Sequence, residues 1–333
     1  MTYEDAATAR PATPAPVVRS FGWMMLFLMG AFLINVILTF WFDWPGIGPV
    51  MGWGSGELGV LPILQTLSYI LAALAAVAYV LRTPHRSLRD DSMMVAGANR
   101  FFIRACFWVV LLVGLADAVV SFLRVEDMLP DLVGEELTGE LGKSAFRGVY
   151  VHVPVLLLGV AIAAVTRSLG FIWLALLVVI AELLIVFSRF IFSYEQAFMG
   201  DLVRFWYAAL FLFASAYTLY EDGHVRVDVI YAGMNPRAKG RVNAIGSILL
   251  GMGLCWVVLL LGMWSKSAII ISPILVFETT QSGFGMYVKY FMAGFLAVFA
   301  VSMLIQFVSY LFESTADARK EQGARAHAGA PGH

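Results

Sequence analysis

The sequence predicts an all-α integral membrane protein with about eight transmembrane helices and both termini in the cytoplasm. Hydrophobic residues make up 60% of the 333 residues, charged residues only 14%, and the mean hydropathy is +0.82. A soluble domain carries about 25% charged residues and has no core large enough for so many apolar side chains. The apolar runs are also long enough to cross a bilayer, which takes about 20 residues.

The chain begins with a polar segment rich in Pro and Ala, so residues 1–20 predict a disordered cytoplasmic tail, as do residues 314–333. The next run, Phe21 to Phe42, is too long for the apolar core of a signal peptide, and no small-residue cleavage site follows it closely. We therefore expect it to be a retained helix. The eight predicted spans are residues 21–42, 59–82, 101–123, 149–166, 170–192, 201–220, 242–264 and 286–312.

The fourth and fifth spans are separated only by Arg167, Ser168 and Leu169, so this region is either a tight hairpin of two helices or one long kinked helix. The distribution of Lys and Arg predicts which side each loop occupies. With the N-terminus inside, the cytoplasmic segments hold fifteen Lys and Arg residues and the external segments hold four. The loop 124–148 is acidic and falls outside, which places it in the periplasm.

The predicted spans form two groups of four. Residues 21–168 form an accessory half that contains the acidic periplasmic loop 124–148, and residues 169–313 form a second half with a basic internal join. We find no sequence repeat between the halves, so a transporter core built from inverted repeats is not supported.

The join in the second half, residues 215–246, is the most distinctive segment of the chain. An apolar helix ends near Tyr220, and the sequence then alternates polar and apolar residues before a second apolar helix. Period-two spacing places His224, Arg226 and Asp228 on one face of an extended segment. A metal or proton-relay site is disfavoured because the Arg repels a cation. A structural clasp at the membrane surface, or a contact with a partner subunit, fits the pattern better.

With the spans on both sides, this join resembles the small membrane subunit (Q-type, small permease) of tripartite ATP-independent periplasmic (TRAP) transporters. The resemblance runs from about Phe171 to Phe312. The string Gly-His-Val-Arg-Val-Asp is its most recognisable part. The residues that also match are Arg189 with Phe190, Asp201 followed by Arg204, Pro236, and the run 287–294 at the start of the last span. The chain departs from the family by having Asp201 for Glu, Phe198 for Trp, and four extra N-terminal spans.

The resemblance implies a non-catalytic small membrane subunit of a sodium-driven secondary transporter for organic acids or similar solutes, in the bacterial inner membrane. In that role it braces the large membrane subunit, and a periplasmic solute-binding protein supplies the solute. The lipid bilayer is the other expected partner, and neither a nucleic acid nor a cofactor is expected. The sequence contains no nucleotide-binding or hydrolase motif, so we expect no enzyme activity.

Charged residues inside the spans are the other candidates for function. Asp117 lies in the third span, where an ionised carboxylate costs about 2.5–3.5 kcal/mol, so it faces protein or water. It serves as a proton or cation relay, or it bonds to a neighbouring helix, or it is protonated. Glu182 and Arg189 share one face of the fifth span, and each is expected to pair with another helix. The alternative function is a stand-alone solute carrier or channel with Asp117 and Glu182 in the path.

The candidate residues of this chain are predicted to have structural or interface roles, and no catalytic, haem or metal site is expected. His152 is the only histidine in a span, which argues against a haem-anchoring subunit. Cys106 and Cys255 lie in apolar runs and are interpreted as small hydrophobic residues, so no metal site is expected. The structural or interface candidates are Glu182, Arg189, Asp201, Arg204, His224, Arg226, Asp228 and Asp117.

Overall fold

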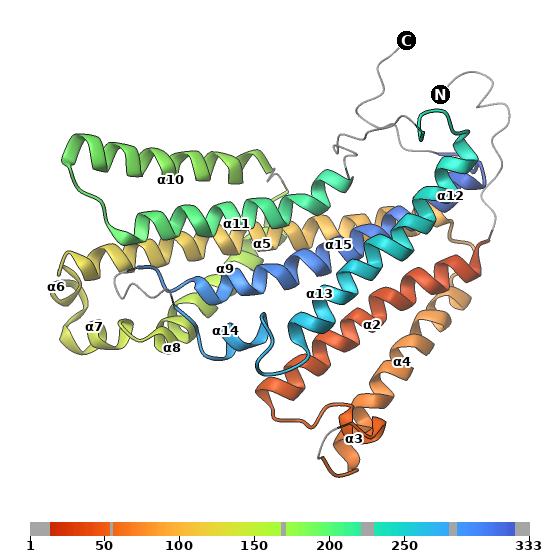
Figure 1. Cartoon of the computed structure of the whole chain (residues 1–333), viewed down its shortest axis with the longest axis horizontal. Coiled ribbons are helices and arrows are strands. Elements are labelled where there is room, and N and C mark those ends of the chain that lie inside the picture. The colour runs from red at the N-terminus through yellow and green to blue at the C-terminus, as the bar shows by residue number, and fades with distance from the viewer. Residues whose placement is uncertain (1–13, 54–55, 168–170, 221–229, 280–284, 324–333) are drawn as a thin grey trace. The chain divides into compact units, whose positions relative to one another are not determined.

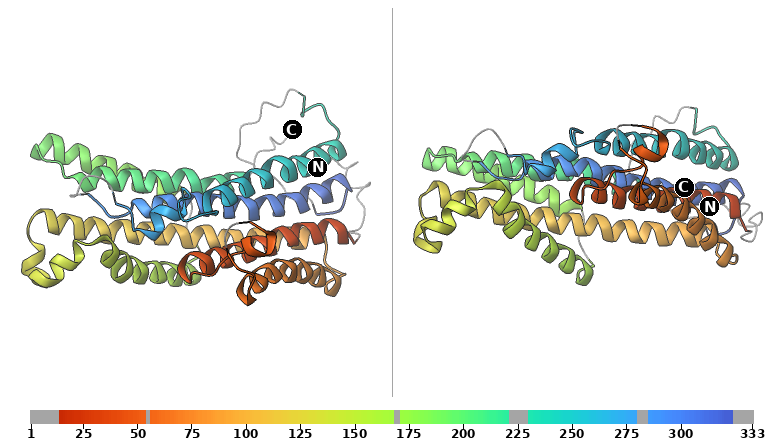
Figure 2. Two further views of the ribbon diagram at one scale, coloured as in Figure 1. Left: turned by 60° about the horizontal axis from the view of Figure 1, so that its bottom comes forward. Right: turned by 90° about the horizontal axis from the view of Figure 1, so that it is seen from below.

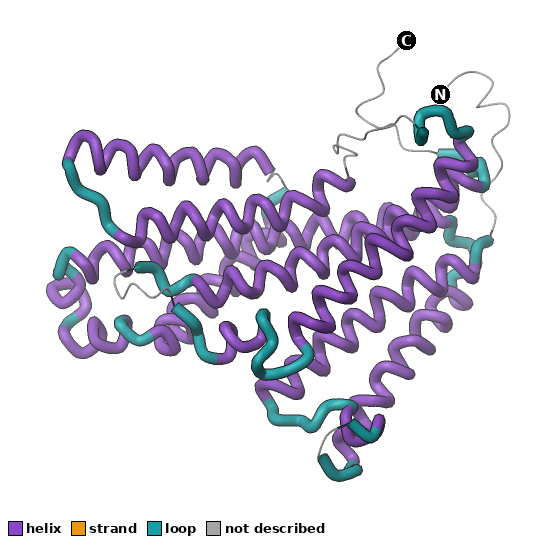
Figure 3. The backbone as a smooth tube through the Cα atoms, viewed as in Figure 1, coloured by secondary structure: helices purple, strands orange, loops and turns teal. Residues whose placement is uncertain are grey.

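The computed structural model describes residues 14–53, 56–167, 171–220, 230–279 and 285–323. Every regular element in these ranges is a helix, and Figure 3 shows the chain as helices joined by loops. Eight of the helices are long and apolar enough to cross a membrane. The predicted all-α membrane fold is therefore confirmed, and the cytoplasmic location of the termini stays a prediction.

The first four spans agree with the predicted ones in order and in approximate position. The fourth span is built from three consecutive helical pieces, one of which is a π-helix. The helices of this region are α2 (Pro16–Trp41), α3 (Gly48–Met51), α4 (Val60–Arg82), α5 (Leu88–Val125), α6 (Leu129–Val133), α7 (Glu135–Leu141), α8 (Ser144–Arg147), η1 (Gly148–His152) and α9 (Val153–Val165). The last three of these form the fourth span.

The last four spans also follow the predicted order. Helix α9 ends where Thr166 adopts an extended conformation, and the next helix begins at Phe171, so the fourth and fifth spans are two separate helices. The helices of this region are α10 (Phe171–Phe192), α11 (Ala197–Tyr220), α12 (Pro236–Gly246), η2 (Ser247–Met252), α13 (Gly253–Met263), α14 (Ile271–Leu275) and α15 (Lys289–Ala318).

Helices α2, α12 and α15 are among those that extend beyond the predicted spans, and polar residues at the extended ends of α2 and α12 find partners. Helix α2 begins at Pro16, inside the predicted tail, and its Arg19 donates from Nε to Asp91 Oδ2 at 2.8 Å. Helix α12 begins at Pro236, where the Asn235 side chain accepts a hydrogen bond from the Ala238 amide and caps the helix. Helix α15 continues to Ala318. The rest of the two predicted tails, residues 1–13 and 324–333, lies outside the described residues.

Helix α5 is one continuous helix of 38 residues, much longer than the predicted span 101–123 (Figure 2). Its first turns contain polar residues, and three of them, Asp91, Ser92 and Asn99, are buried against other helices. Asp91 is bonded to Arg19 of α2, and the Ser92 and Ser309 hydroxyls lie 2.9 Å apart. The Asn99 amide donates to Gln306 of α15. These pairings allow the helix to continue through a polar stretch that an apolar pattern does not reveal.

The chain forms two compact units, each containing segments from both predicted halves. Unit 1 comprises Met1–Asn99, Thr218–Leu260 and Met303–His333, and unit 2 comprises Arg100–Tyr217 and Leu261–Ser302. In unit 1, Arg89 of α5 forms ion pairs with Glu313 and Asp317 of α15. In unit 2, aromatic side chains of α5, α11 and α15 pack into one apolar core that includes Phe107, Phe205 and Phe295. The proposed division at residues 168 and 169 stays a prediction, since it follows the resemblance.

Candidate functional site: a buried polar network in unit 2

A buried polar network in unit 2 is centred on Asp117 of α5. Asp117, Ser121 and Arg124 are spaced four and then three residues apart, so α5 presents them on one face. Asp117 and Ser121 are completely buried. Asp117 lies eight residues before the end of α5, so it is nearer to one end of the helix than to its middle.

The cation that pairs with Asp117 is Arg147, at the end of α8. Arg147 Nη1 lies 2.9 Å from Asp117 Oδ1 and 3.1 Å from Ser121 Oγ, and its Nε donates to the Leu141 carbonyl at 3.0 Å. Both charged side chains are fully buried, so neither charge is screened by solvent. The Arg147 Nη2 group has no hydrogen-bond partner among the described residues.

His152, in the π-helical turn η1, is the second group that binds Asp117. Its Nε2 lies 3.0 Å from Asp117 Oδ1, and its Nδ1 lies 2.7 Å from the Tyr290 hydroxyl. In the neutral ring, Nε2–H donates to the carboxylate and the Tyr290 hydroxyl donates to Nδ1. A π-helical turn widens the helix by one residue, and such turns are frequent at functional sites.

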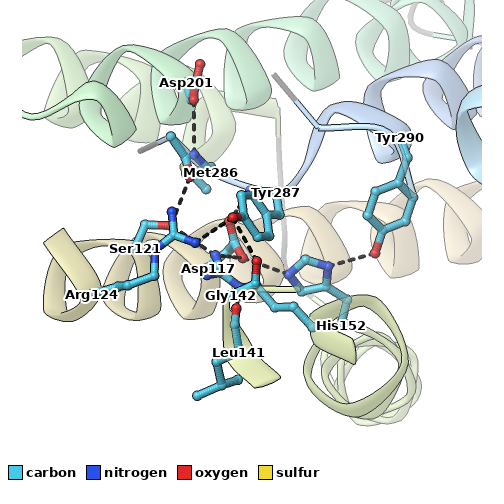
Figure 4. Close-up of polar contacts among 12 residues, drawn as sticks. Asp117, Ser121, Arg124, Leu141, Gly142, His152, Asp201, Met286, Tyr287 and Tyr290 are labelled. Carbon is cyan, nitrogen blue, oxygen red and sulfur yellow. Dashed lines mark hydrogen bonds and ion pairs between the residues drawn. The ribbon is translucent and has the colours of Figure 1, made fainter. Parts of the chain in front are cut away.

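The network also fixes the segment that leads into α15 (Figure 4). The Tyr287 amide donates to Asp117 Oδ2 at 2.7 Å, and the preceding amide, that of Met286, donates to Asp201 Oδ2 at 3.0 Å. Two carboxylates, one from α5 and one from α11, therefore hold two consecutive backbone N–H groups. These amides precede the first turn of α15 and have no helical partner of their own.

The Tyr287 side chain packs against the two arginines of the network, Arg124 and Arg147. Its ring centroid lies 4.1 Å from the Arg147 guanidinium carbon and 4.9 Å from that of Arg124. The Tyr287 hydroxyl donates to the Gly142 carbonyl at 3.0 Å and accepts from Arg124. An aromatic face beside a desolvated cation adds about 2 kcal/mol of attraction. The ring therefore helps to hold the Arg147 side chain in place.

Chemically, this arrangement is a structural clamp. Both Asp117 oxygens accept hydrogen bonds from the chain itself, so the carboxylate has no open side for a solute or an ion. Within the part of the chain that the structure describes, no three His, Cys, Asp or Glu residues could hold a metal ion. Of the possibilities considered for Asp117, the bond to a neighbouring helix is the one that the contacts support.

Of the other predicted charged residues that the structure describes, only Asp201 and Arg204 lie close to each other. Asp201 is buried and binds the Met286 amide, while Arg204 is exposed and lies 3.4 Å from Asp201. Arg189 is exposed and pairs with Glu195 in the following loop at 2.5 Å. Glu182 is exposed on α10 and forms no hydrogen bond or ion pair with a described residue. His224, Arg226 and Asp228 lie outside the described residues.

Six side chains of the network were not predicted as site residues from the sequence: Ser121, Arg124, Arg147, His152, Tyr287 and Tyr290. A carboxylate inside an apolar helix needs a donor, and Arg147 and His152 are the basic residues at the start of the next span. Their pairing with Asp117 follows from this need once Arg147 is treated as part of a helix. The two tyrosines carry no such signal, because hydroxyl groups at a helix start are common.

Comparison with known protein families gives a match within the second half of the chain. The family model described as the DctQ component of tripartite ATP-independent periplasmic transporters matches residues 176–316. The matched residues make up somewhat less than half of the chain, so the match describes its second half. The match agrees with the resemblance expected from Phe171 to Phe312, and it includes Glu182, Asp201 and the α15 end of the network. Comparison with curated proteins and with solved structures gave no match.

The DctQ match covers residues 176–316, and additional apolar helices, long enough to cross a membrane, lie in front of the matched region. The network therefore joins two kinds of sequence. Asp117, Arg147 and His152 come from the additional helices, whereas Asp201, Met286, Tyr287 and Tyr290 belong to the DctQ region.

Proposed function

We propose that this protein is the non-catalytic small membrane subunit of a sodium-driven TRAP transporter for organic acids or similar solutes. The observation that carries the proposal is the DctQ match over residues 176–316 in a chain with eight helices able to span a membrane. Its expected partners are the large membrane subunit, which moves the solute, and a periplasmic solute-binding protein, which captures it.

The mechanical role that we propose is to brace the large subunit. A subunit that moves a solute by sliding through the membrane needs a neighbour that stays fixed relative to the lipid. A buried network such as that around Asp117 suits this role, because buried polar groups that are bonded to one another hold the helices in fixed positions. Ion pairs such as that between Arg19 and Asp91 give the helices of unit 1 the same kind of support.

The alternative, a stand-alone solute carrier or channel, gains no support from the two residues placed in its path. Asp117 is completely buried and all its contacts are internal. Glu182 is on the exposed surface of α10. A solute path needs convergent polar groups near the middle of the membrane, and these two carboxylates share no partner among the described residues.

Reconstitution into liposomes tests the proposal. The purified protein alone, given an inward sodium gradient and a panel of labelled organic acids, is expected to give no uptake above empty vesicles. Addition of the large subunit and the loaded binding protein is expected to restore uptake. Uptake by the protein alone, or failure to co-purify with the large subunit, would overturn the proposal.

A further inference from the structure

Helix α10 is unusual in unit 2 because almost all of its surface is exposed. Among residues 175–192, only Ala181 and Ser188 are buried. The helix packs against the rest of unit 2 through a narrow stripe that contains Leu177, Val178, Ala181 and Ile185. In Figure 1 it lies at the edge of the unit, beside α11. The rest of its circumference faces lipid or another protein.

Glu182 lies on this exposed surface near the middle of the helix, where a charge facing lipid costs the most free energy. Helix α10 has 22 residues and Glu182 is the twelfth, so its Cα lies about 1 Å from the midpoint of the helix axis. A helix of this length spans the hydrocarbon core, which places Glu182 near the centre of the bilayer. Lipid tails offer no hydrogen-bond donor, and intramembrane carboxylates almost always face protein or water.

The residues around Glu182 form a regular seam along one flank of α10. Ala175, Val179, Glu182, Val186 and Arg189 are spaced by four, three, four and three residues. This spacing keeps side chains on one face of a helix that packs closely against another helix. Ala and Val are small enough to let two helix backbones approach. The opposite flank carries Ile180 and Phe187, which are bulky, exposed and uncharged.

We propose that this seam, Ala175–Val179–Glu182–Val186–Arg189, binds a transmembrane helix of the large membrane subunit, with Glu182 accepting a hydrogen bond from a donor side chain of that helix. The inference rests on the function proposed above, because it needs a membrane partner. It adds which surface of this chain meets the partner and which chemistry the partner supplies. The partner residue is a cation or a strong neutral donor at mid-membrane depth.

A second copy of this chain is a poorer occupant of the same seam. In a two-fold dimer across this flank, each Glu182 would face the other copy's Glu182 near the symmetry axis. Two carboxylates in one apolar interface repel, and one of them would have to be protonated. A different protein with a donor at this depth satisfies Glu182 without that cost. The DctQ match, which describes one component of a tripartite system, supplies such a protein.

Site-specific photo-cross-linking in the full chain tests the seam. Benzoylphenylalanine is placed at Val179 or Val186 on the seam, and at Ile180 or Phe187 on the opposite flank as controls of equal depth, in cells that co-express the large subunit. Adducts with the large subunit are expected from the two seam positions and at least several-fold less from the controls. No adduct, equal adducts from both flanks, or adducts only with a second copy would overturn the inference.

Substitution of Glu182 tests the chemistry separately. Glu182→Leu is expected to lower the affinity for the large subunit about 3- to 30-fold, which corresponds to the roughly 0.6–2 kcal/mol of one polar contact between membrane helices. Glu182→Gln keeps an acceptor and is expected to lose less, and Phe187→Leu is the control. If lipid covered Glu182, the Leu variant would insert better and bind as well as wild type, which would overturn the inference.

The two proposals fail in different ways. If wild-type protein does not co-purify with the large subunit, the proposed function is wrong. If wild type co-purifies but the seam gives no specific adducts, or the Glu182→Leu variant binds normally, the function stands and the assignment of the seam is wrong.

Discussion

Removing the carboxylate at the centre of the buried network is the sharpest test of its structural role. In Asp117→Leu, the donors Arg147 Nη1, His152 Nε2 and the Tyr287 amide all lose their acceptor. Arg147 becomes a fully buried cation without a counter-ion. Breaking a buried ion pair by removing one partner costs about 3–5 kcal/mol. We therefore expect a large loss of stability from a single substitution.

A double substitution separates the ion pair from the remaining bonds. In Asp117→Leu with Arg147→Met, the stranded charge is removed and apolar side chains fill the space. Such replacements are often close to neutral, so we expect the double variant to be more stable than Asp117→Leu. It keeps the unpaired Tyr287 amide, and each unsatisfied buried donor costs about 1–3 kcal/mol. The double variant therefore remains less stable than wild type.

Thermal unfolding of the detergent-purified chain, followed by tryptophan fluorescence, measures these differences. With about 2–4 °C per kcal/mol for domains of moderate size, Asp117→Leu is expected to lower the apparent Tm by at least roughly 5 °C. Glu140→Gln is the matched control, because its ion pair with Lys143 is exposed and contributes little. An Asp117→Leu variant as stable as this control, or a double variant less stable than Asp117→Leu, would refute the structural role of the network.

Three further predictions follow from the same structure. The first places a single cysteine at Glu135 or at Asn235, in a chain without the two native cysteines. An impermeant maleimide added from outside is expected to label position 135 and not position 235. Labelling at 235 but not at 135 would show that the predicted topology is inverted. Gly159→Ala is expected to lower the free energy of unfolding by about 1–3 kcal/mol, because the added Cβ would lie 2.9 Å from a backbone nitrogen of α5. Gly139 has open space around it, so Gly139→Ala is the neutral control in the same unfolding assay. A chain that begins at Ser168 is expected to give a lower yield of folded protein by size exclusion than the full chain, since it lacks α5.

The sequence predicts the helices that apolar composition alone stabilises and misses what depends on pairing. All eight spans are recognisable because about 20 apolar residues in a row have few other solutions. The first turns of α5 are not recognisable, because Asp91, Ser92 and Asn99 look like loop residues until Arg19, Ser309 and Gln306 are placed beside them. Partners more than 70 residues away leave no periodic signal.

The candidate site shows the same limit. The cost of a charge in an apolar helix predicts that Asp117 has a donor, but it does not say which of many donors. Arg147 falls in the loop 124–148, which the Lys and Arg count places outside, so the sequence gives no sign that it pairs with Asp117. Glu182 and Arg189 are seven residues apart, too far to pair along one helix, so the sequence predicts that each pairs with another helix. Arg189 pairs with Glu195 in a loop instead, whereas Glu182 has no partner among the described residues.

The network bears on what the additional N-terminal helices do. The DctQ match begins at residue 176, after the additional helices. The segment that leads into α15 lies inside the match, and two carboxylates hold it. Asp201 of α11 belongs to the matched region, whereas Asp117 of α5 belongs to the additional helices. Without α5, the Tyr287 amide loses its acceptor. Without α8 and η1, Asp117 would remain as an unpaired buried charge, so the carboxylate is useful only together with Arg147 and His152. Asp117, Arg147 and His152 each cost free energy when buried alone and stabilise the fold only together, so we expect the three residues to be retained as a set. Helix α5, one of the additional helices, therefore supplies one of the two carboxylates that hold the segment before α15.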